Sequence, residues 1–437
     1  MTILEDILER ARRVADEAEV FAVTSVDTPV HFEANRLKAV QERQTWAAGL
    51  RIIKGGRIGL ASTNRQDDPQ GVVERALETL ALGAEATFTL PEPQPYPHVP
   101  LYDPTVEALS AQALVDLGQG AIDALLSRWP QVLWECRVGK AVSTVTILNS
   151  KGLHASYTRS ITSIGLEGSW IQDGDMVFFW ESQVSCHPIR DSGEVVASLH
   201  AQLENAQRLV PAPQGEVPVV FTPKGVASLL MMPLLSGLNG RNLVRKASPL
   251  EGKMGQQVVD PRFTLVDDPT IPYTPGSRAF DDEGVPSQRI PLIERGVLQG
   301  FLFDLQTASL AKARSSGSAS RSVGTLPSPS SSVVVITEGD TPLADALGTL
   351  RQGLIVEGVL GAGQGNVLAG DFQANVLLGF RVEGGQVVGR VKETMVSGNV
   401  YHALQRLIAV SRERRWVGGS LLSPTLICAG VTVAAKH

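Results

Sequence analysis

The stretch TWAAGLRIIKGGRIGLAS, residues 45–62, predicts a β-hairpin. Two runs of mainly apolar residues flank the pair Gly55 and Gly56. Consecutive glycines supply the positive φ angles that a two-residue hairpin turn requires. The same extended pattern occurs just upstream, at residues 20–25 and 30–33. We therefore expect antiparallel strands in the early part of the chain.

Helical patterns lie on both sides of this hairpin. Apolar residues recur at helical spacing over residues 3–15, and Thr2 with Glu5 can form a capping box at the helix start. A second helix is predicted to begin at Pro69 and to bury one face formed within residues 72–80.

Two proline-rich segments, residues 91–104 and 210–216, interrupt the pattern. Because each proline removes an amide donor and fixes φ, such segments cannot continue a helix or a central strand. We place the main domain boundary at the second segment. The predicted domains are an N-terminal α+β domain, 1–210, in which segments 1–90 and 105–208 are joined by 91–104, and a β-rich domain, 211–437.

The remaining patterns define the fold class. Before the boundary we expect helices over 105–129 and 193–208, and strands over 132–138, 142–148, 156–170 and 176–185. After the boundary the helical signal is limited to 225–235, 341–350 and 399–410, and the rest consists of short strands broken by glycine. The backbone N–H and C=O groups at the edges of such strands must be kept from pairing with other chains, so a barrel or a sandwich is expected. The chain is predicted to be α+β, with antiparallel strands in its N-terminal domain and a β-rich C-terminal domain.

Composition excludes several classes of protein. The chain has 437 residues, of which 43% are hydrophobic and 19% charged, so it can bury a large core and is not disordered. A net charge of -6 and an isoelectric point near 5.7 argue against direct nucleic-acid binding, which favours a basic surface.

The cysteines and the N-terminus indicate a cytoplasmic protein. Cys136, Cys186 and Cys428 lie far apart and are odd in number, so neither a disulfide framework nor a thiolate zinc site is predicted. The first residues lack the features of a signal peptide. The apolar stretch 426–435 is shorter than the roughly 20 residues that a membrane helix requires.

Unaided spacing arguments reveal no catalytic centre. The seven histidines are too widely spaced for a helical zinc motif, which needs two ligands on one face. Asp281, Asp282 and Glu283 precede Gly284, and we interpret them as a solvated turn and not as a cation site. The serine-rich segment 314–332 is predicted to be an exposed connector.

Several segments together resemble the TldD/PmbA family, also called the modulator of DNA gyrase family. The clearest of them reads FDDEGVPSQR at residues 280–289. Further similar segments follow the order of the family along nearly the whole chain, at residues 30–37, 49–62, 149–153, 292–298, 317–321, 383–386 and 396–399.

The resemblance implies a cytoplasmic zinc-dependent peptidase built from two related subunits, which cuts unfolded or modified peptides in a cavity between them. In the TldD-like subunit of the family, one helix carries H-E-x-x-x-H. Here Met231, Met232 and Ser236 stand at about these positions. A thioether replaces neither imidazole for zinc nor carboxylate for water activation. Cys428 falls later than the family's cysteine ligand, so that role is not assigned to it.

This departure places the chain with the PmbA branch, also called TldE-like. We predict a subunit with no catalytic and no metal-binding residues, which forms part of the peptide chamber and is inactive alone. Met231, Met232 and Ser236 are predicted to line that chamber. The expected partner is a zinc-containing TldD-like subunit or a second copy of the chain. The alternative is a stand-alone homodimer that binds peptides or modulates gyrase without peptidase activity.

Overall fold

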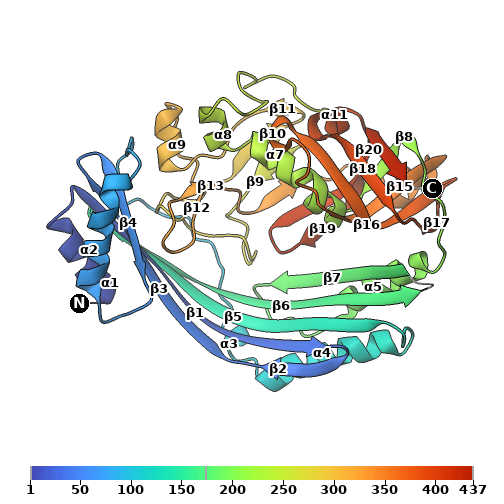
Figure 1. The fold of residues 1–437 in the computed structure, drawn as a ribbon, viewed down its shortest axis with the longest axis horizontal. Coiled ribbons are helices and arrows are strands. Elements are labelled where there is room, and N and C mark those ends of the chain that lie inside the picture. The colour runs from blue at the N-terminus through green and yellow to red at the C-terminus, as the bar shows by residue number, and fades with distance from the viewer. Residues whose placement is uncertain (1, 173–174, 436–437) are drawn as a thin grey trace.

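The computed structural model describes residues 2–172 and 175–435, and these form an α+β protein with two large sheets (Figure 1). The predicted fold class is confirmed. In the described part, the first sheet has seven strands in the order β4-β3-β1-β5-β6-β7, with β2 paired to β1. They are β1 (Glu17–Glu33), β2 (Arg36–Val40), β3 (Arg43–Lys54), β4 (Arg57–Thr63), β5 (Leu133–Asn149), β6 (His154–Gln172) and β7 (Asp175–Ser185).

The predicted hairpin is confirmed as the β3–β4 pair. Lys54 lies opposite Arg57, and the two glycines between them have φ angles of 55° and 73°. One expectation for this sheet was wrong, because the two strands predicted over 132–148 are a single strand, β5. Gly139 does not break it, since this residue pairs with Pro29 on one side and Ser163 on the other.

Helices cover the two ends of the first sheet. At one end lie α1 (Ile3–Arg12), α2 (Pro69–Thr79) and η1 (Leu80–Leu82), and at the other lie α4 (Ala111–Leu126) and α5 (Gly193–Ala206). The capping box of α1 is confirmed, with Thr2 and Glu5 bonded to each other's backbone amides. The helix predicted over 105–129 is divided into α3 (Pro104–Glu107) and α4, because Ser110 caps a new helix.

The second sheet contains a closed barrel, which confirms the expectation of a barrel or a sandwich. Strand β8 pairs in parallel with β15 and antiparallel with β20, and this double pairing closes the ring β8-β15-β16-β18-β20. Its strands are β8 (Gly215–Phe221), β15 (Gln352–Leu360), β16 (Asp371–Glu383), β18 (Thr394–Asn399) and β20 (Leu421–Ala435). The sheet is extended by β9 (Leu265–Asp267), β10 (Ile290–Glu294), β11 (Val297–Leu298), β14 (Val334–Ile336), β17 (Gln386–Arg390) and β19 (Leu407–Val417).

Short helices and one small strand pair complete the C-terminal part. The helices are α6 (Pro223–Gly225), η2 (Val226–Leu230), α7 (Met231–Gly237), α8 (Gly240–Val244), α9 (Leu305–Leu310), α10 (Leu343–Gly348), η3 (Val367–Ala369) and α11 (Val400–Gln405), and the strands are β12 (Ala319–Ser320) and β13 (Ser328–Pro329). The helix predicted over 399–410 ends early, because Leu407 and Val410 pair with β20 as part of β19.

The two sheets share an apolar core. Leu199 and Leu203 of α5 belong to the same buried cluster as Val220, Ile355 and Phe380 of the barrel strands. The first sheet ends at β7 and the second begins at β8. The predicted domain boundary at 210/211 lies between these two strands. It stays a prediction, because buried apolar contacts join the residues on its two sides.

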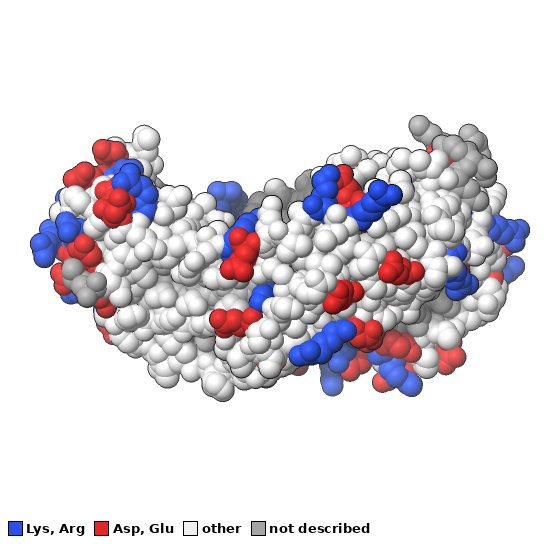
Figure 2. All heavy atoms as spheres, turned by 90° about the horizontal axis from the view of Figure 1, so that it is seen from below, with Lys and Arg blue, Asp and Glu red and all other residues white. Residues whose placement is uncertain are grey.

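The distribution of charged side chains on the surface agrees with the modest net charge of the chain. Seen from below, the molecule is an elongated crescent on which charged side chains of both signs are scattered between large uncharged areas (Figure 2). Within residues 2–172 and 175–435, no helix is both long and apolar enough to cross a membrane.

Candidate functional site

The helix with the predicted site positions begins with an unusual turn. Thr222 caps it, α6 leads into the π-helical turn η2, and α7 follows. Pro233, near the start of α7, has no amide hydrogen for the regular bond to Leu229. The wider turn η2 ends three residues before this proline, and such π turns often occur at functional sites.

The structure places the three predicted site residues in three different environments. Met231 is 7% exposed and packs in the core of the barrel. Met232 is 51% exposed, and its sulfur lies beside Gly363. Ser236 is half buried, and its Oγ accepts a hydrogen bond of 3.1 Å from the side-chain amide of Asn242. Met232 and Ser236 share one helix face, whereas Met231 points away from it.

These residues do not fit a zinc ion. Zinc sites in proteins use imidazole, thiolate and carboxylate ligands, whereas this helix offers thioethers and a hydroxyl. Cys428 is fully buried in β20 opposite Val219, and burial raises the pKa of its thiol, so it stays neutral. In the part of the chain that the structure describes, no group of three or more His, Cys, Asp or Glu residues is arranged to hold a metal.

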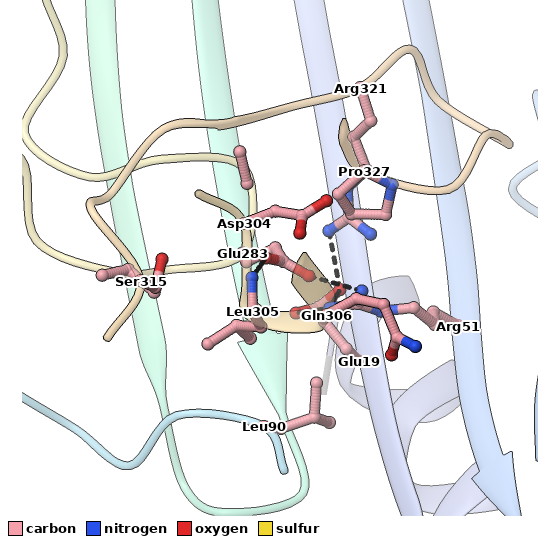
Figure 3. A network of polar contacts seen from close by, with 12 residues as sticks. Glu19, Arg51, Leu90, Glu283, Asp304, Leu305, Gln306, Ser315, Arg321 and Pro327 are labelled. Atoms are coloured by element: carbon pink, nitrogen blue, oxygen red, sulfur yellow. Dashed lines mark hydrogen bonds and ion pairs between the residues drawn. The ribbon is translucent and has the colours of Figure 1, made fainter. Parts of the chain in front are cut away.

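Charged residues gather at a different place, the junction between the first sheet and the C-terminal part of the chain. Arg51 of β3 lies opposite Glu19 of β1 in the sheet, and their side chains form an ion pair of 3.1 Å. A second nitrogen of Arg51 lies 2.6 Å from Glu283, and Arg321 lies 2.7 Å from Glu19. All four side chains are at most 3% exposed. We call these four residues the junction network (Figure 3).

The segment around Glu283 is held by its own backbone and by the serine-rich segment. Asp281 accepts hydrogen bonds from the amides of Glu283, Val285 and Ala319. Asp282 accepts one from the amide of Arg321. These contacts fix the position of Glu283 beside Arg51.

Two expectations from the sequence were therefore wrong. The acidic segment is not a solvated turn, because Asp281, Asp282 and Glu283 are 0%, 9% and 1% exposed. The segment 314–332 is not an exposed connector throughout, because Ser318 and Ala319 within it are fully buried. The two segments lie against each other in the interior. Backbone amides of the serine-rich segment donate to the carboxylates of the acidic segment, and the amide of Asp282 donates to the carbonyl oxygen of Ala319.

Burial and neighbouring charges act against each other in this cluster. Burial raises the pKa of Glu283 to about 7 against the opposing effect of Arg51, and nearby Asp281 and Asp304 add to the increase. Burial also raises the pKa of Asp281 to about 6. For Glu19, burial acts in the same direction, but Arg321 and Arg51 outweigh it and lower the pKa.

One residue in the sequence signals this network. Arg51 lies inside an otherwise apolar run, between Leu50 and Ile52, at a position where a strand faces the core. A buried arginine needs carboxylate partners. Its partner Glu283 is 232 positions away in the chain, so the sequence alone could not identify it.

Residues 214–435, about half of the chain, match the family described as PmbA/TldA metallopeptidase C-terminal domain, and residues 18–80 match PmbA/TldA metallopeptidase domain 1. The crystal structure of TldE from Thermococcus kodakarensis superposes with a TM-score of 0.91 at 25% identity, covering 99% of this chain and 100% of that chain.

Curated relatives agree with this match. A metalloprotease PmbA homologue of Haemophilus influenzae is 28% identical over 426 residues, which cover 92% of this chain and 89% of the relative. A metalloprotease TldD homologue of the same organism is 32% identical over 225 residues, 50% of this chain and 46% of the relative. The chain belongs to the PmbA/TldD metallopeptidase family.

Proposed function

We propose that this chain is the non-catalytic, metal-free subunit of a cytoplasmic TldD/TldE-type metallopeptidase. It completes the chamber in which a TldD-like partner cleaves unfolded or modified peptides. One observation carries the proposal: the helix η2–α7 offers Met231, Met232 and Ser236 where the resemblance implies the metal ligands and the catalytic glutamate of the partner.

The surface beside α7 supports a role in contacting a peptide or a partner. The helix packs against η3, and both elements expose apolar side chains. Met232 is 51% and Leu368 45% exposed, and nearby Leu360 at the end of β15 is 62% exposed. Exposed apolar groups that lie together often mark an interaction surface.

The relatives support a two-subunit assembly. The similar solved structure is a TldE, and Haemophilus influenzae has both a PmbA homologue and a TldD homologue that resemble this chain. A catalytic subunit with a non-catalytic counterpart is therefore the arrangement that we propose for this chain and a TldD-like partner.

Reconstitution tests the proposal. The purified chain should contain no stoichiometric zinc and should not cleave a fluorescently labelled unstructured peptide. Adding a TldD-like subunit from the same organism should give a heteromer in native mass spectrometry and peptide cleavage that needs both subunits. Stoichiometric zinc in this chain, or cleavage by it alone, would refute the proposal. Failure to form a heteromer, with a homodimer that binds the peptide uncut, would favour the stand-alone binding protein instead.

A surface variant tests the role of α7 within the assembly. Met232→Lys places a charge on the exposed apolar surface and should reduce heteromer formation or peptide cleavage at least tenfold. Leu37→Lys is the matched control, because Leu37 is 46% exposed on the distant strand β2. Equal activity of both variants and the wild type would show that α7 faces neither the peptide nor the partner.

A further inference from the structure

A cavity of about 340 Å³ lies directly beside the junction network. Arg51 and Glu283 of the network form part of its wall, together with residues from α8, α9 and the segment before β13. Asp304 and Pro327, which also line the cavity, lie next to the network in Figure 3. A cavity of this volume is at the lower end of the range that holds small molecules.

The cavity combines apolar walls with buried polar groups. Phe88, Leu310 and Leu326 provide apolar surface, and the guanidinium of Arg51 lies 5.1 Å from the centre of the Phe88 ring. Asp304 is only 1% exposed although it lines the cavity. Sites for small ligands have this character, with apolar walls for affinity and a few fixed polar groups for orientation.

One buried carboxyl group in this cavity lacks an ionic partner. Asp304 caps α9, where its Oδ1 accepts hydrogen bonds from the amide and the hydroxyl of Thr307 at 2.7 and 2.6 Å. Among residues 2–172 and 175–435, no donor reaches its other oxygen, Oδ2, and no cation pairs with the carboxylate. A buried carboxylate with a free oxygen is costly unless a cation or donor from outside satisfies it.

Two cationic groups in the same wall also lack acidic partners. Arg241 lies near the start of α8, and Arg245, four positions later, caps its C-terminal end. Arg241 donates to the carbonyl oxygen of Pro327 at 3.1 Å, and Arg245 is exposed. Within the described ranges, neither forms an ion pair with a carboxylate. Guanidinium groups in this situation are well suited to bind a carboxylate in a bidentate manner.

We propose that this cavity binds an apolar dipeptide with free termini. The ammonium group of the ligand pairs with Asp304, its carboxylate with Arg241 and Arg245, and its apolar side chains lie against Phe88 and Leu310. A ligand with one positive and one negative end matches the free charges of the wall. This site is separate from α7, and the inference does not depend on the proposed function.

Titration calorimetry with L-leucyl-L-leucine tests the site on the full-length protein. The dipeptide should bind saturably and raise the midpoint of thermal unfolding, since a ligand that binds only the folded state stabilises it. N-acetyl-leucyl-leucine, which lacks the ammonium group, and leucyl-leucinamide, which lacks the carboxylate, should each bind at least tenfold more weakly. No saturable binding at millimolar concentration, or equal binding of the capped forms, would overturn the proposal.

Two variants locate the binding site. Asp304→Asn keeps an oxygen for the cap of α9, because Asn and Asp cap helices about equally well. It should weaken binding of the dipeptide about tenfold and leave binding of the N-acetyl form unchanged. Arg245→Gln should weaken the dipeptide and leave the amide form unchanged.

Matched controls separate the site from general effects of charge or capping. Asp68→Asn changes the cap of α2 in the same way, and Arg36→Gln removes an exposed charge on β2. Both should bind the dipeptide as the wild type does. If Asp304→Asn fails to fold, the comparison of free and capped dipeptides on the wild type still decides the outcome.

Discussion

The helix η2–α7 and the junction network differ in the charge and the burial of their side chains. On the helix, the three positions of interest carry neutral side chains, and one of them, Met231, belongs to the apolar core. At the junction, Glu19, Arg51, Glu283 and Arg321 are all charged types that are almost completely buried. The resemblance implies metal ligands on the corresponding helix of a TldD-like subunit, whereas in this chain the buried charged residues lie at the junction network and not on that helix.

This difference shows that burial determines what a charged side chain does in the structure. A buried ion pair that joins distant segments fixes their relative position, because breaking it leaves an uncompensated charge in a medium of low dielectric constant. A half-exposed apolar helix face has no such constraint and can contact a peptide or a partner.

Removing the central charge of the junction network should have the largest effect. Arg51→Met leaves Glu19 and Glu283 buried without their shared partner, and we expect a loss of about 4 kcal/mol in the free energy of unfolding. Urea denaturation followed by circular dichroism measures it. Arg43→Met is the control on the same strand, where Arg43 is 57% exposed and pairs with Asp27, and should cost less than about 1 kcal/mol. Similar losses in the free energy of unfolding for both variants would mean that the buried ion pairs of Arg51 stabilise the fold no more than the exposed pair of Arg43.

Truncating the two neighbouring methionines should separate the two faces of α7. Met231→Ala removes a side chain from the barrel core and should cost about 3 kcal/mol in the free energy of unfolding. Met232→Ala, on the exposed face, should change it by less than about 0.5 kcal/mol. Thermal and urea unfolding of both variants provide the measurement, and a loss for Met232→Ala as large as for Met231→Ala would contradict the assigned orientation.

The junction network should also make stability depend on pH. The pKa of Glu283 is raised from 4.5 to about 7 in the folded protein, so the folded state holds its proton over this interval while the unfolded state has lost it. The stabilisation is complete below about pH 4.5 and is lost as the pH rises towards 7.

Glu283→Gln removes this titration. The difference in unfolding free energy, wild type minus variant, should decrease by on the order of 3 kcal/mol between pH 4.5 and 8. Urea titrations at half-unit pH steps follow the change. A difference that is constant with pH, or that increases, would show that Glu283 does not have a raised pKa.

The smallest effect is expected for Ser236→Ala. This change removes the acceptor Oγ, but the amide of Asn242 still donates to the carbonyl oxygen of residue 236 at 2.8 Å. We expect a loss below about 1 kcal/mol in the free energy of unfolding, as is usual for one neutral hydrogen bond. A loss above about 2 kcal/mol would mean that the hydroxyl has a structural role comparable to that of the junction network.

Local features were predictable because they depend on neighbouring residues. The turn at Gly55 and Gly56, the capping box of α1 and the barrel-forming strands follow from φ preferences, caps and periodicity. The helix predicted over 399–410 is confirmed over Val400–Gln405, but its last part was wrong, because β20 offers hydrogen bonds to residues 407–417 and this pairing outweighs the local helical pattern.

The candidate site was only partly predictable. The residues Met231, Met232 and Ser236 could be named from the resemblance, but their exposure depends on how the helix rests on the barrel. The burial of Asp281 to Glu283 could not be foreseen, because it depends on Arg51 and Ala319, far away in the chain.

The α+β class, the family resemblance and the neutral residues at the helix positions of the family's metal motif follow from the residues alone, since these are properties of composition and short-range order. Which charged residues are buried together, and where a cavity forms beside them, depends on the folded chain. Ion pairs such as Arg51–Glu283 join segments separated by 232 positions, and short-range preferences contain no information about such contacts.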